Sequence, residues 1–451
     1  MDNPFENIQR DGRFRLIAEL AEFFGVEAFL VGGGLRDAVM GRAVRDFDFA
    51  LSGAEEELPK ELACRVGGSF FWLDRERRQS RVVTGRGVDS FTFDFAPLRG
   101  RDLREDLFLR DFTVNSLALP ATRAHSPLID PLGGVKDITE GRIRACGERS
   151  FDDDPLRLMR AIRFAATLGF DIDADTWSEM VKRPFLLDGV AGERIRDEFF
   201  LILTATGIDS SLEMLRRSGL LAMMIPRESR VEESSRESEE RIARTAEVEK
   251  VLEEPDIHFP DDGREMAGYL RRRIEGGVTL LSLVKLAAFL AGEDAGKRIE
   301  LYSARLCLGT KAGNELKSLC RCAASFPPMT AEMPGDRILF RFFRDREPAG
   351  PELVVVPLAA RVIIPELAVR LVSYFFHDYR PQEGNLLLSG NQVMALLGIG
   401  PGPELGRVME TLRQAESLGR LSSATEAGEF LLKNQLTNRE PMGYKNRLTR
   451  E

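Results

Sequence analysis

The residues of this chain best suited to chemistry are two acids in a stretch that is otherwise typical of a buried strand. Asp46 and Asp48 alternate with Phe47 and Phe49 in the segment RDFDFAL. Side chains two apart on a strand point to the same face, so the carboxylates share one face and the rings share the other. Adjacent carboxylates repel each other unless a cation lies between them, and a magnesium pair that clamps a nucleoside triphosphate and an attacking oxygen requires such acids. The alternative is a surface-facing strand with alternating Asp, because D-x-D is short and common.

A glycine turn precedes these acids and favours the metal-site interpretation. Residues 31–37, VGGGLRD, continue an apolar run. Three glycines let the backbone approach an anion closely, and the N–H groups at the start of the next helix can bind phosphate. Arg36 can add charge-assisted hydrogen bonds. A phosphate-binding turn followed by a metal-binding strand is a nucleotidyltransferase arrangement.

The elements that must position these residues can be placed from hydrophobic spacing and turn residues. Short helices and strands alternate at first, and the strand signal becomes weak from Asp111 onward. The sequence therefore predicts a small mixed α/β head followed by a long helical part. The expected helices of the head cover residues 12–25 and 35–41, and its expected strands lie within residues 27–31, 45–51, 67–74, 80–85 and 89–99.

A strongly helical segment, DPLRLMRAIRFAATLGF, follows the head. Asp154 is its expected N-cap and Pro155 its first-turn residue. Arg157, Arg160 and Arg163 are spaced by three and lie on one side of this helix. An acid at a helix start and an Arg one turn later can present acceptors and donors to the edge of a base. The alternative is N-capping and a solvated Arg face.

Length and charge limit the possible architectures and partners. The chain has 451 residues, of which 43% are hydrophobic and 30% charged. This length predicts about two to four domains with sizeable cores. The net charge is −9, so a nucleic-acid partner must be bound by a local basic patch. The six arginines between residues 142 and 163 are expected to contribute to such a patch.

Cysteine usage and hydropathy indicate a protein of the reducing cytosol without a membrane span. The five cysteines are odd in number and form no regular framework. Cys320 and Cys322 lack a second pair or a nearby His, which argues against zinc. Charged residues and prolines interrupt the apolar stretches 278–292 and 353–376, which predicts core helices or strands. No signal peptide is expected.

Five segments together resemble the class II tRNA nucleotidyltransferase and bacterial poly(A) polymerase family. The first contains the glycine turn and D-x-D, the second resembles the family's Arg-Arg-Asp-Phe-Thr-x-Asn-Ala block, and the third resembles the entry to its nucleotide-reading neck. The last two resemble the following helix and the tail of tRNA nucleotidyltransferases. These segments are residues 31–49, 104–119, 130–170, 192–203 and 387–412.

The resemblance implies roles for the acids of the head. It makes Asp46 and Asp48 catalytic residues and the ligands of Mg²⁺. Asp94, in DFAPLR, falls where the family has a Glu followed five residues later by an Arg, here Arg99. Asp94 is therefore a candidate third catalytic carboxylate, and a strand-edge acid is the alternative.

The resemblance also implies which residues bind the nucleotide. Asp154 and Arg157 correspond to the family's base-reading acid and arginine, with Arg110 as their partner. The acidic residue before Asp154 is Asp153, where the family usually has Glu. The remaining residues expected to bind the nucleotide are Gly32, Gly33, Arg36, Asp37, Asp111, Asn115, Arg160 and Arg163.

Two departures from the family pattern bear on which nucleotides are added. Leu109-Arg110 stands where the family usually has two arginines. Many members also carry a loop of a few dozen residues before this block, whereas only six residues separate Arg99 from Asp106 here. In this family, loss of the loop accompanies enzymes that add the two C residues without the terminal A. The sequence therefore hints at a CC-adding enzyme, and a full CCA-adding enzyme, an A-adding enzyme or a bacterial poly(A) polymerase is the alternative.

Other functions fit the sequence less well. A histidine-aspartate phosphohydrolase domain needs several His ligands, and the chain has three scattered histidines. A poly(A) polymerase is expected to end in a basic arm, which the last 50 residues do not form. A catalytically inactive RNA-binding protein is expected to lose an acid of D-x-D, and both acids are present.

The combined prediction is a cytoplasmic, template-independent enzyme that adds nucleotides of the 3′-terminal CCA to tRNA from CTP and ATP and releases pyrophosphate. Its expected fold is an α/β polymerase-β-like nucleotidyltransferase head followed by an all-α neck, body and tail. Its expected partners are the tRNA 3′ end, CTP and ATP, with no membrane. The charged segment 226–275 predicts a solvated helix pair or a mobile loop. The expected domains are the head at 1–140, the neck at 141–210, the body at 211–345 and the tRNA-binding tail at 346–451.

Overall fold

The computed structural model divides the chain into two compact units. The N-terminal unit comprises Met1–Ser238 and Leu301–Leu308, and the C-terminal unit comprises Glu239–Glu300 and Gly309–Glu451. The division into head, neck, body and tail remains a prediction. The structure describes residues 4–85, 90–122, 126–230, 234–324, 326, 333–379, 386–417, 420–421 and 423–438.

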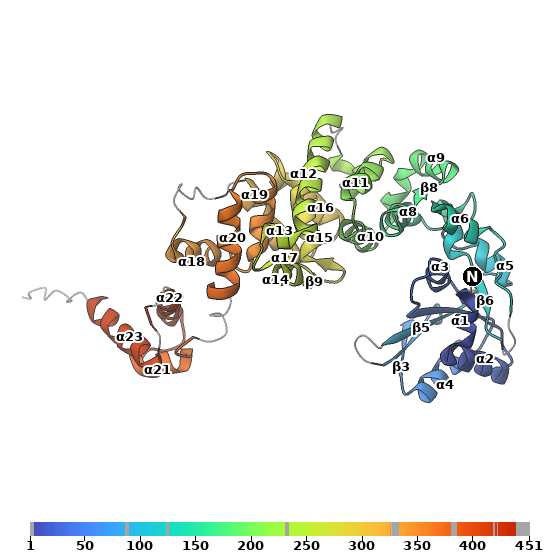
Figure 1. Ribbon diagram of the computed structural model, residues 1–451, viewed down its shortest axis with the longest axis horizontal. Coiled ribbons are helices and arrows are strands. Elements are labelled where there is room, and N and C mark those ends of the chain that lie inside the picture. Colours follow the sequence, from blue (N-terminus) through green and yellow to red (C-terminus); the bar gives the residue numbers. More distant parts are fainter. Residues whose placement is uncertain are drawn as a thin grey trace, which may run out of the picture. The chain divides into compact units, whose positions relative to one another are not determined.

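The N-terminal unit contains a six-stranded mixed sheet (Figure 1), which confirms the predicted mixed α/β head, although its strand at Ala118–Pro120 lies outside the five predicted strand segments. Its strand order is β3-β4-β5-β2-β1-β6. The β2–β5 pair is parallel, and the other neighbouring strands are antiparallel. The strands are β1 (Ala28–Val31), β2 (Asp46–Leu51), β3 (Ser69–Asp74), β4 (Gln79–Thr84), β5 (Phe91–Pro97) and β6 (Ala118–Pro120).

Helices α2 (Gly12–Phe24) and α4 (Glu57–Val66) cover one face of this sheet. Phe49 of β2 stacks on Phe95 of β5 with 5.6 Å between ring centroids, and Phe14 of α2 lies 6.2 Å from Phe49. All three rings are buried. Gly25 ends α2 with a φ of 66°, which is the predicted stop and a conformation that favours glycine. The apolar side chains of β2, the strand that carries Asp46 and Asp48, thus pack the sheet against its helices.

The other described helices of the predicted head are short. The glycine turn leads directly into α3, which begins at Gly33, two residues earlier than expected. These helices are α1 (Pro4–Arg10), α3 (Gly33–Val39), α5 (Leu103–Phe108) and α6 (Gly134–Glu140), with a 3₁₀ turn at Thr113–Asn115.

The rest of the N-terminal unit is mainly helical, with a two-residue parallel strand pair, β7 (Arg142–Ile143) and β8 (Asp171–Ile172). Helix α8 begins at Arg157, later than predicted and after a turn at residues 155–156. Asp154 has extended backbone angles, which are usual for a capping residue, and its carboxylate accepts a hydrogen bond from the N–H of Leu156. Asp154 thus caps the turn that leads into α8 and not α8 itself. The helices are α7 (Ser150–Asp153), α8 (Arg157–Leu168), α9 (Ala174–Lys182), α10 (Gly192–Thr204) and α11 (Ile208–Arg217), with 3₁₀ turns at Pro184–Gly189, Ala222–Met224 and Arg227–Ser229.

The described part of the C-terminal unit is helical apart from a two-stranded hairpin, β9 (Arg273–Glu275) and β10 (Val278–Thr279). Its most buried helix is α15 (Leu280–Leu290), which the apolar stretch 278–292 predicts. Among the described helices, none combines the length and hydropathy that a membrane span needs. The other described helices are α12 (Ser235–Glu253), α13 (Pro255–His258), α14 (Gly263–Leu270), α16 (Ala295–Arg305), α17 (Thr310–Ala324), α18 (Asp336–Arg344), α19 (Val355–Ala359), α20 (Pro365–Tyr374), α21 (Gly390–Leu397), α22 (Pro403–Ser417) and α23 (Ala424–Asn438), with a 3₁₀ turn at Pro351–Val354 and a π-helical turn at Phe375–Tyr379. Residues 235–238 of α12 and 301–305 of α16 belong to the N-terminal unit.

The charged segment 226–275 is more buried than predicted. Helix α12 accounts for much of it, and Arg241 of this helix is only 3% exposed. Arg241 donates a hydrogen bond of 2.9 Å to the carbonyl of Phe289 in α15. Glu249 forms a buried ion pair of 2.7 Å with Lys285. The segment therefore includes a packed helix with charged groups in its buried face, so a solvated helix pair or mobile loop does not describe it.

Candidate active site

Three aspartates lie on the face of the sheet opposite α2 and α4. Asp48 of β2 and Asp94 of β5 are direct partners in the parallel register, and Asp46 lies two residues before Asp48. Phe47 and Phe49 are buried on the other face, as the alternation predicts. Asp46 is exposed, whereas Asp48 and Asp94 are partly buried. The fold thus brings all three predicted carboxylates to one face.

The surroundings of Asp48 oppose its negative charge. Burial, together with the negative charges of Asp94 and Asp46, raises the pKa of Asp48 to about 6, although Arg110 and Arg81 counteract part of the shift. A cation bound beside these carboxylates would remove this repulsion. The electrostatics therefore suits a metal-binding role for D-x-D.

Asp94 has a close partner that the sequence interpretation missed. Arg81 of β4 is its direct neighbour in the antiparallel register. The Arg81 Nε and Nη2 atoms donate to the two Asp94 carboxylate oxygens at 2.6 Å and 2.7 Å. Such a bidentate pair fixes both the position and the orientation of the carboxylate. Arg81 therefore positions Asp94 on the sheet.

The donor set fits a cation that arrives together with a nucleotide. Within the described ranges, no three His, Cys, Asp or Glu side chains are grouped closely enough to hold a metal ion by themselves. Mg²⁺ in phosphate-handling sites is typically bound by one or two carboxylates, with phosphate oxygens and water completing its octahedron. Asp46 and Asp48 supply that number of carboxylates, while Asp94 is engaged by Arg81.

The glycine turn approaches these acids closely. Gly32 has a φ of 78°, and a Cβ on this residue would lie 3.3 Å from Oδ2 of Asp48 and 3.6 Å from Nη1 of Arg110. A Cβ on Gly34 would lie 2.9 Å from the carbonyl oxygen of Asp46. The turn therefore needs glycine for backbone conformation at Gly32 and for close packing at Gly34. Gly33 begins α3 next to Gly32.

A pocket of about 790 Å³ joins the glycine turn, the carboxylates and helix α8. Eight arginines and five aspartates are among its lining residues, which makes it locally basic in an acidic chain. Asp37 and Asp46 are the two predicted site residues outside the lining; Asp37 pairs with Arg36 at 3.0 Å. The predicted residues that line it are Gly32, Gly33, Arg36, Asp48, Asp94, Arg110, Asp111, Asn115, Asp154, Arg157, Arg160 and Arg163.

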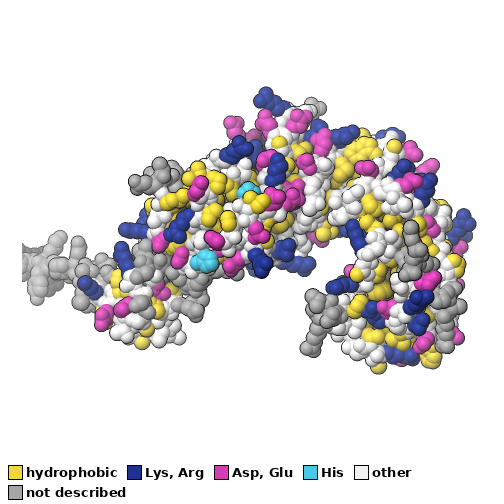
Figure 2. Space-filling model, viewed as in Figure 1, with side chains coloured by type: hydrophobic (Ala, Val, Ile, Leu, Met, Phe, Trp, Pro, Cys, Tyr) yellow, Lys and Arg dark blue, Asp and Glu magenta, His cyan; other side chains and the backbone are white. Residues whose placement is uncertain are grey.

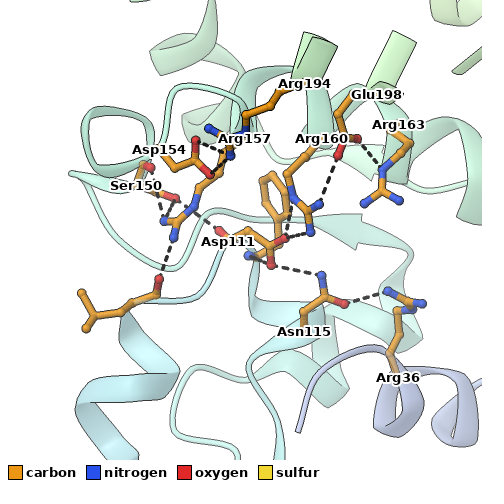
Figure 3. Close-up of polar contacts among 12 residues, drawn as sticks. Arg36, Asp111, Asn115, Ser150, Asp154, Arg157, Arg160, Arg163, Arg194 and Glu198 are labelled. Carbon is orange, nitrogen blue, oxygen red and sulfur yellow. Dashed lines mark hydrogen bonds and ion pairs between the residues drawn. The ribbon is translucent and has the colours of Figure 1, made fainter. Parts of the chain in front are cut away.

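A chain of hydrogen bonds crosses this pocket from α3 to α10 (Figure 3). Arg36 donates to the amide oxygen of Asn115 at 2.7 Å, and the Asn115 amide donates to Asp111 at 3.1 Å. Arg160 donates to Oδ2 of Asp111 at 2.6 Å and to Oε1 of Glu198 at 3.1 Å. Burial alone would raise the pKa of Asp111, but Arg160 and the hydrogen bonds lower it to about 2. Asp111 is therefore a permanent anion that holds two nucleotide-binding candidates in place.

Three arginines of the pocket lie close to one aromatic ring. Phe164 of α8 lines the pocket, and the guanidinium carbons of Arg163, Arg160 and Arg36 lie 4.1, 5.3 and 5.5 Å from its ring centroid. Arg163 is also paired with Glu198 at 2.7 Å. These contacts place three cations around one ring, and cation–π attraction contributes to that arrangement.

The predicted base readers both have protein partners. Arg157 is only 8% exposed, and it donates to the carbonyl and hydroxyl of Ser150 at 3.2 and 3.0 Å and to the carbonyl of Leu109 at 2.7 Å (Figure 3). Asp154 is paired with Arg194 of α10 at 3.1 Å. The solvated Arg face considered from the sequence is thus absent at Arg157. Both residues still line the pocket, Arg157 from the first turn of α8 and Asp154 from the segment just before it.

The connection between β5 and α5 is short and fixed. Residues 98–102 are all that join the two elements. The N–H of Arg99 donates to Oδ1 of Asp106 at 3.0 Å, and Oδ2 of the same carboxylate accepts from Arg110 at 2.8 Å. Asp106 is 1% exposed. This buried acid ties the short connection to Arg110.

The arginines between residues 142 and 163 carry less free charge than expected. Basic and acidic side chains are interspersed on the face shown in Figure 2, and this segment follows the same pattern. Pairing with nearby acids reduces its attraction for phosphate. The pairs are Arg142–Glu140 at 3.3 Å, Arg144–Asp137 at 2.6 Å, Arg149–Asp153 at 3.8 Å and Arg160–Asp111 at 2.6 Å.

Sequence reasoning missed several residues of the pocket for different reasons. Asp106 and Arg110 are four apart, which is a helical ion-pair spacing that could have been used. Glu198 lies in the segment 192–203, which resembles the family over its whole length and contains no local signal that distinguishes this acid from its neighbours. Arg81 and Arg194 depend on strand register and helix packing, for which the sequence contains no local signal.

Two family models match this unit. The model described as "Poly A polymerase head domain" matches residues 28–144. The model described as "Probable RNA and SrmB- binding site of polymerase A" matches residues 169–228. The sheet, its acids and the arginine-lined pocket lie within or next to these ranges. Fold and site together define a nucleotidyltransferase.

Relatives that align with this chain over nearly their whole length identify its family. A CC-adding tRNA nucleotidyltransferase of Geobacter sulfurreducens is 39% identical over 95% of this chain and 96% of its own length. An A-adding tRNA nucleotidyltransferase of Deinococcus radiodurans is 32% identical over 90% of this chain and 94% of its own. The crystal structure of the Bacillus stearothermophilus CCA-adding enzyme in complex with CTP has the same fold, with a TM-score of 0.63 and 22% identity over 97% of this chain and 99% of that one. The chain belongs to the tRNA nucleotidyltransferase family.

Proposed function

We propose that this enzyme adds the two C residues of the CCA end to the 3′ end of tRNA, using CTP and releasing pyrophosphate. The tRNA 3′-hydroxyl would attack the α-phosphate in line, with no covalent intermediate. The observation that carries the proposal is the arginine-lined pocket that opens onto Asp48 and its neighbouring acids. Positioning and electrostatic stabilisation suffice for such a reaction.

The acids of the sheet would hold the cofactor. Asp46 and Asp48 are the proposed ligands of Mg²⁺, which when bound neutralises charge on the triphosphate and the attacking oxygen. Asp94, oriented by Arg81, is the proposed third catalytic carboxylate. The proton of the 3′-hydroxyl leaves towards this acidic face. The raised pKa of Asp48 supports the need for a cation here.

Residues on both sides of the acids would bind the nucleotide. Gly32, Gly33 and Arg36 are proposed to bind the triphosphate, with Asp37 fixing the Arg36 guanidinium at 3.0 Å. The network around Asp111 would then keep Asn115 and Arg160 in place, as Glu198 does for Arg163. The charge of these arginines suits a polyanionic ligand.

Asp154 and Arg157 are proposed to read the base, with Arg110 as their partner. A carboxylate accepts from the amino group that C and A share, and a guanidinium donates to the adjacent ring nitrogen, so U and G are rejected. In the structure, the Asp154 carboxylate accepts a hydrogen bond from Arg194. A bound base would therefore share or replace this contact.

The short connection at residues 98–102 supports CC addition over CCA addition. A site whose neighbouring loop is this short and hydrogen-bonded at Arg99 has little means of changing from CTP to ATP after two additions. The Geobacter sulfurreducens relative is a CC-adding tRNA nucleotidyltransferase, which agrees with this proposal. Use of ATP for the final residue is the alternative, because the Deinococcus radiodurans relative is named as A-adding.

The other parts of the chain have proposed roles as well. The neck would carry the base readers, and the helical body and tail would bind tRNA through shape and phosphate contacts. The odd number of cysteines favours a cytoplasmic enzyme.

A nucleotide-incorporation assay on three tRNA transcripts tests this proposal. The transcripts end before the first C, before the second C and before the A. We expect two, one and no additions respectively when CTP and ATP are both supplied. Efficient A addition to the third transcript would overturn the CC assignment, and no addition to any transcript would overturn the wider proposal.

A further inference from the structure

One row of side chains runs across the sheet from the acids to its edge. Directly paired residues share a face, and the pairs Asp48–Asp94, Asp94–Arg81 and Arg81–Phe71 are in register. The row therefore leads from the D-x-D strand through the third carboxylate and its arginine to Phe71 on edge strand β3. Adjacent strands are about 4.8 Å apart, so Phe71 lies roughly 10 Å from Asp94 along this row.

Strand β3 presents apolar side chains on the catalytic face. Phe71 is 42% exposed and Leu73 is 48% exposed, and Leu73 lines the pocket. The alternate residues, Phe70 and Trp72, are less exposed and contact each other edge to face. No ring among the described residues stacks on Phe71. Exposed apolar side chains gathered beside a pocket are typical of a binding surface.

In-line chemistry determines which substrate reaches this side of the acids. The attacking oxygen and the leaving pyrophosphate must lie on opposite sides of the α-phosphorus. The glycine turn and Arg36 follow β1, on one side of Asp48 in the strand order, whereas Phe71 lies beyond β5 and β4 on the other side. With the triphosphate at the glycine turn, the acceptor strand must approach from the β3 side.

We propose that the Phe71 ring is the stacking platform for the 3′-terminal base of the RNA acceptor, with Leu73 extending the apolar surface. This inference rests on the proposed function. Stacking on an aromatic ring tolerates any base, because every base has a π-face. The acceptor needs such tolerance, since its terminal base changes after each addition. The contact places the terminal nucleotide beside Asp94 without reading its identity.

Two acceptors and three variants test the platform. The acceptors are a tRNA transcript that lacks its CCA end and the same transcript with an abasic 3′-terminal nucleotide. The variants are Phe71→Ala, Phe71→Trp as a conservative replacement, and Phe23→Ala as a control. Phe23 is 73% exposed and lies on α2, away from the catalytic face. CTP incorporation gives KM and kcat, and fluorescence anisotropy gives acceptor binding without catalysis.

We expect Phe71→Ala to raise the KM and Kd for the ordinary acceptor roughly 5- to 150-fold, the range of one lost stack. The KM for CTP should stay unchanged, Phe71→Trp should retain binding, and Phe23→Ala should resemble the wild type. On the abasic acceptor, the wild type and Phe71→Ala should bind equally. An equal loss on both acceptors, or no loss on either, would overturn the platform. If the wild type binds the acceptor but incorporates no CTP, the proposed function is rejected. The binding of Phe71→Ala to the two acceptors would then still test the platform.

Discussion

The substitution Asp111→Asn should weaken both the fold of the N-terminal unit and its affinity for CTP. Asp111 accepts hydrogen bonds from Arg160 at 2.6 and 3.0 Å and from Asn115 at 3.1 Å. Asparagine keeps the shape of the side chain but removes its charge. Arg160 then keeps Glu198 as its only anionic partner among the described residues, and the Asn115 amide, which links to Arg36, loses an anionic acceptor.

The magnitude follows from the shift of the Asp111 pKa. Interactions in the fold lower this pKa from 3.8 to about 2, and each unit corresponds to about 1.4 kcal/mol. The charged form therefore stabilises the fold by about 2–3 kcal/mol. Because the folded-state pKa lies below the unfolded value, this contribution is complete above about pH 4 and is lost as the pH falls through about 2. Between pH 5 and pH 8 the stability difference should be constant.

Tryptophan fluorescence during urea unfolding measures the stability of the N-terminal unit, which contains Asp111. The chain has two tryptophans, Trp72 and Trp177, and both belong to the N-terminal unit. Asp37→Asn is the matched control, because Asp37 also pairs with an arginine but its side chain is 31% exposed. A pair this exposed contributes less than about 1 kcal/mol. The KM for CTP is measured on the same two variants.

Equal stability of the two variants at pH 7.5 would refute the assignment of Asp111 as a buried structural anion. A difference that grows or shrinks between pH 5 and pH 8 would also refute it, because the carboxylate would then titrate near neutrality. An unchanged KM for CTP in Asp111→Asn would show that the hydrogen-bond network around Asp111 does not contribute to nucleotide binding.

Three further outcomes are expected. Arg157→Ala should reduce discrimination between CTP and UTP roughly tenfold or more, and it should lower stability because the Leu109 carbonyl loses its donor; unchanged selectivity in competition assays would exclude base reading. Glu198→Gln should raise the KM for CTP severalfold, since Arg160 and Arg163 share this carboxylate, whereas Asp197→Asn, which is 56% exposed, should not. Affinity for tRNA should fall steeply between 50 and 200 mM salt, roughly 10³-fold or more if six or more phosphates are contacted, and a flat response in filter binding would contradict phosphate-dominated binding.

The features that depend on local periodicity could be predicted from the sequence. Asp46 and Asp48 share a face because strand side chains alternate, and Phe47 and Phe49 are buried for the same reason. The glycine turn was placed correctly because only glycine suits its backbone. The helical segment with its three arginines was also correct, although it begins at Arg157, after a turn.

The features that depend on tertiary packing could not be predicted. The Arg81–Asp94 pair requires the register of β4 on β5. The Glu198 contacts require α10 to pack on α8. Burial of Arg157 depends on the carbonyl of Leu109, 48 residues away. A solvated arginine face and a built polar network have the same sequence spacing, and only the fold distinguishes them.

Transfer of CMP to a tRNA transcript that lacks its CCA end, with and without the two acids of D-x-D, tests the central claim most directly. The wild type with Mg²⁺ should add two C residues, and addition should stop in EDTA. Asp46→Ala and Asp48→Ala should remove transfer by several orders of magnitude while tRNA binding and tryptophan-detected unfolding show that the fold persists. Wild-type-like transfer by either variant would contradict metal-assisted nucleotidyl transfer at this pair of carboxylates.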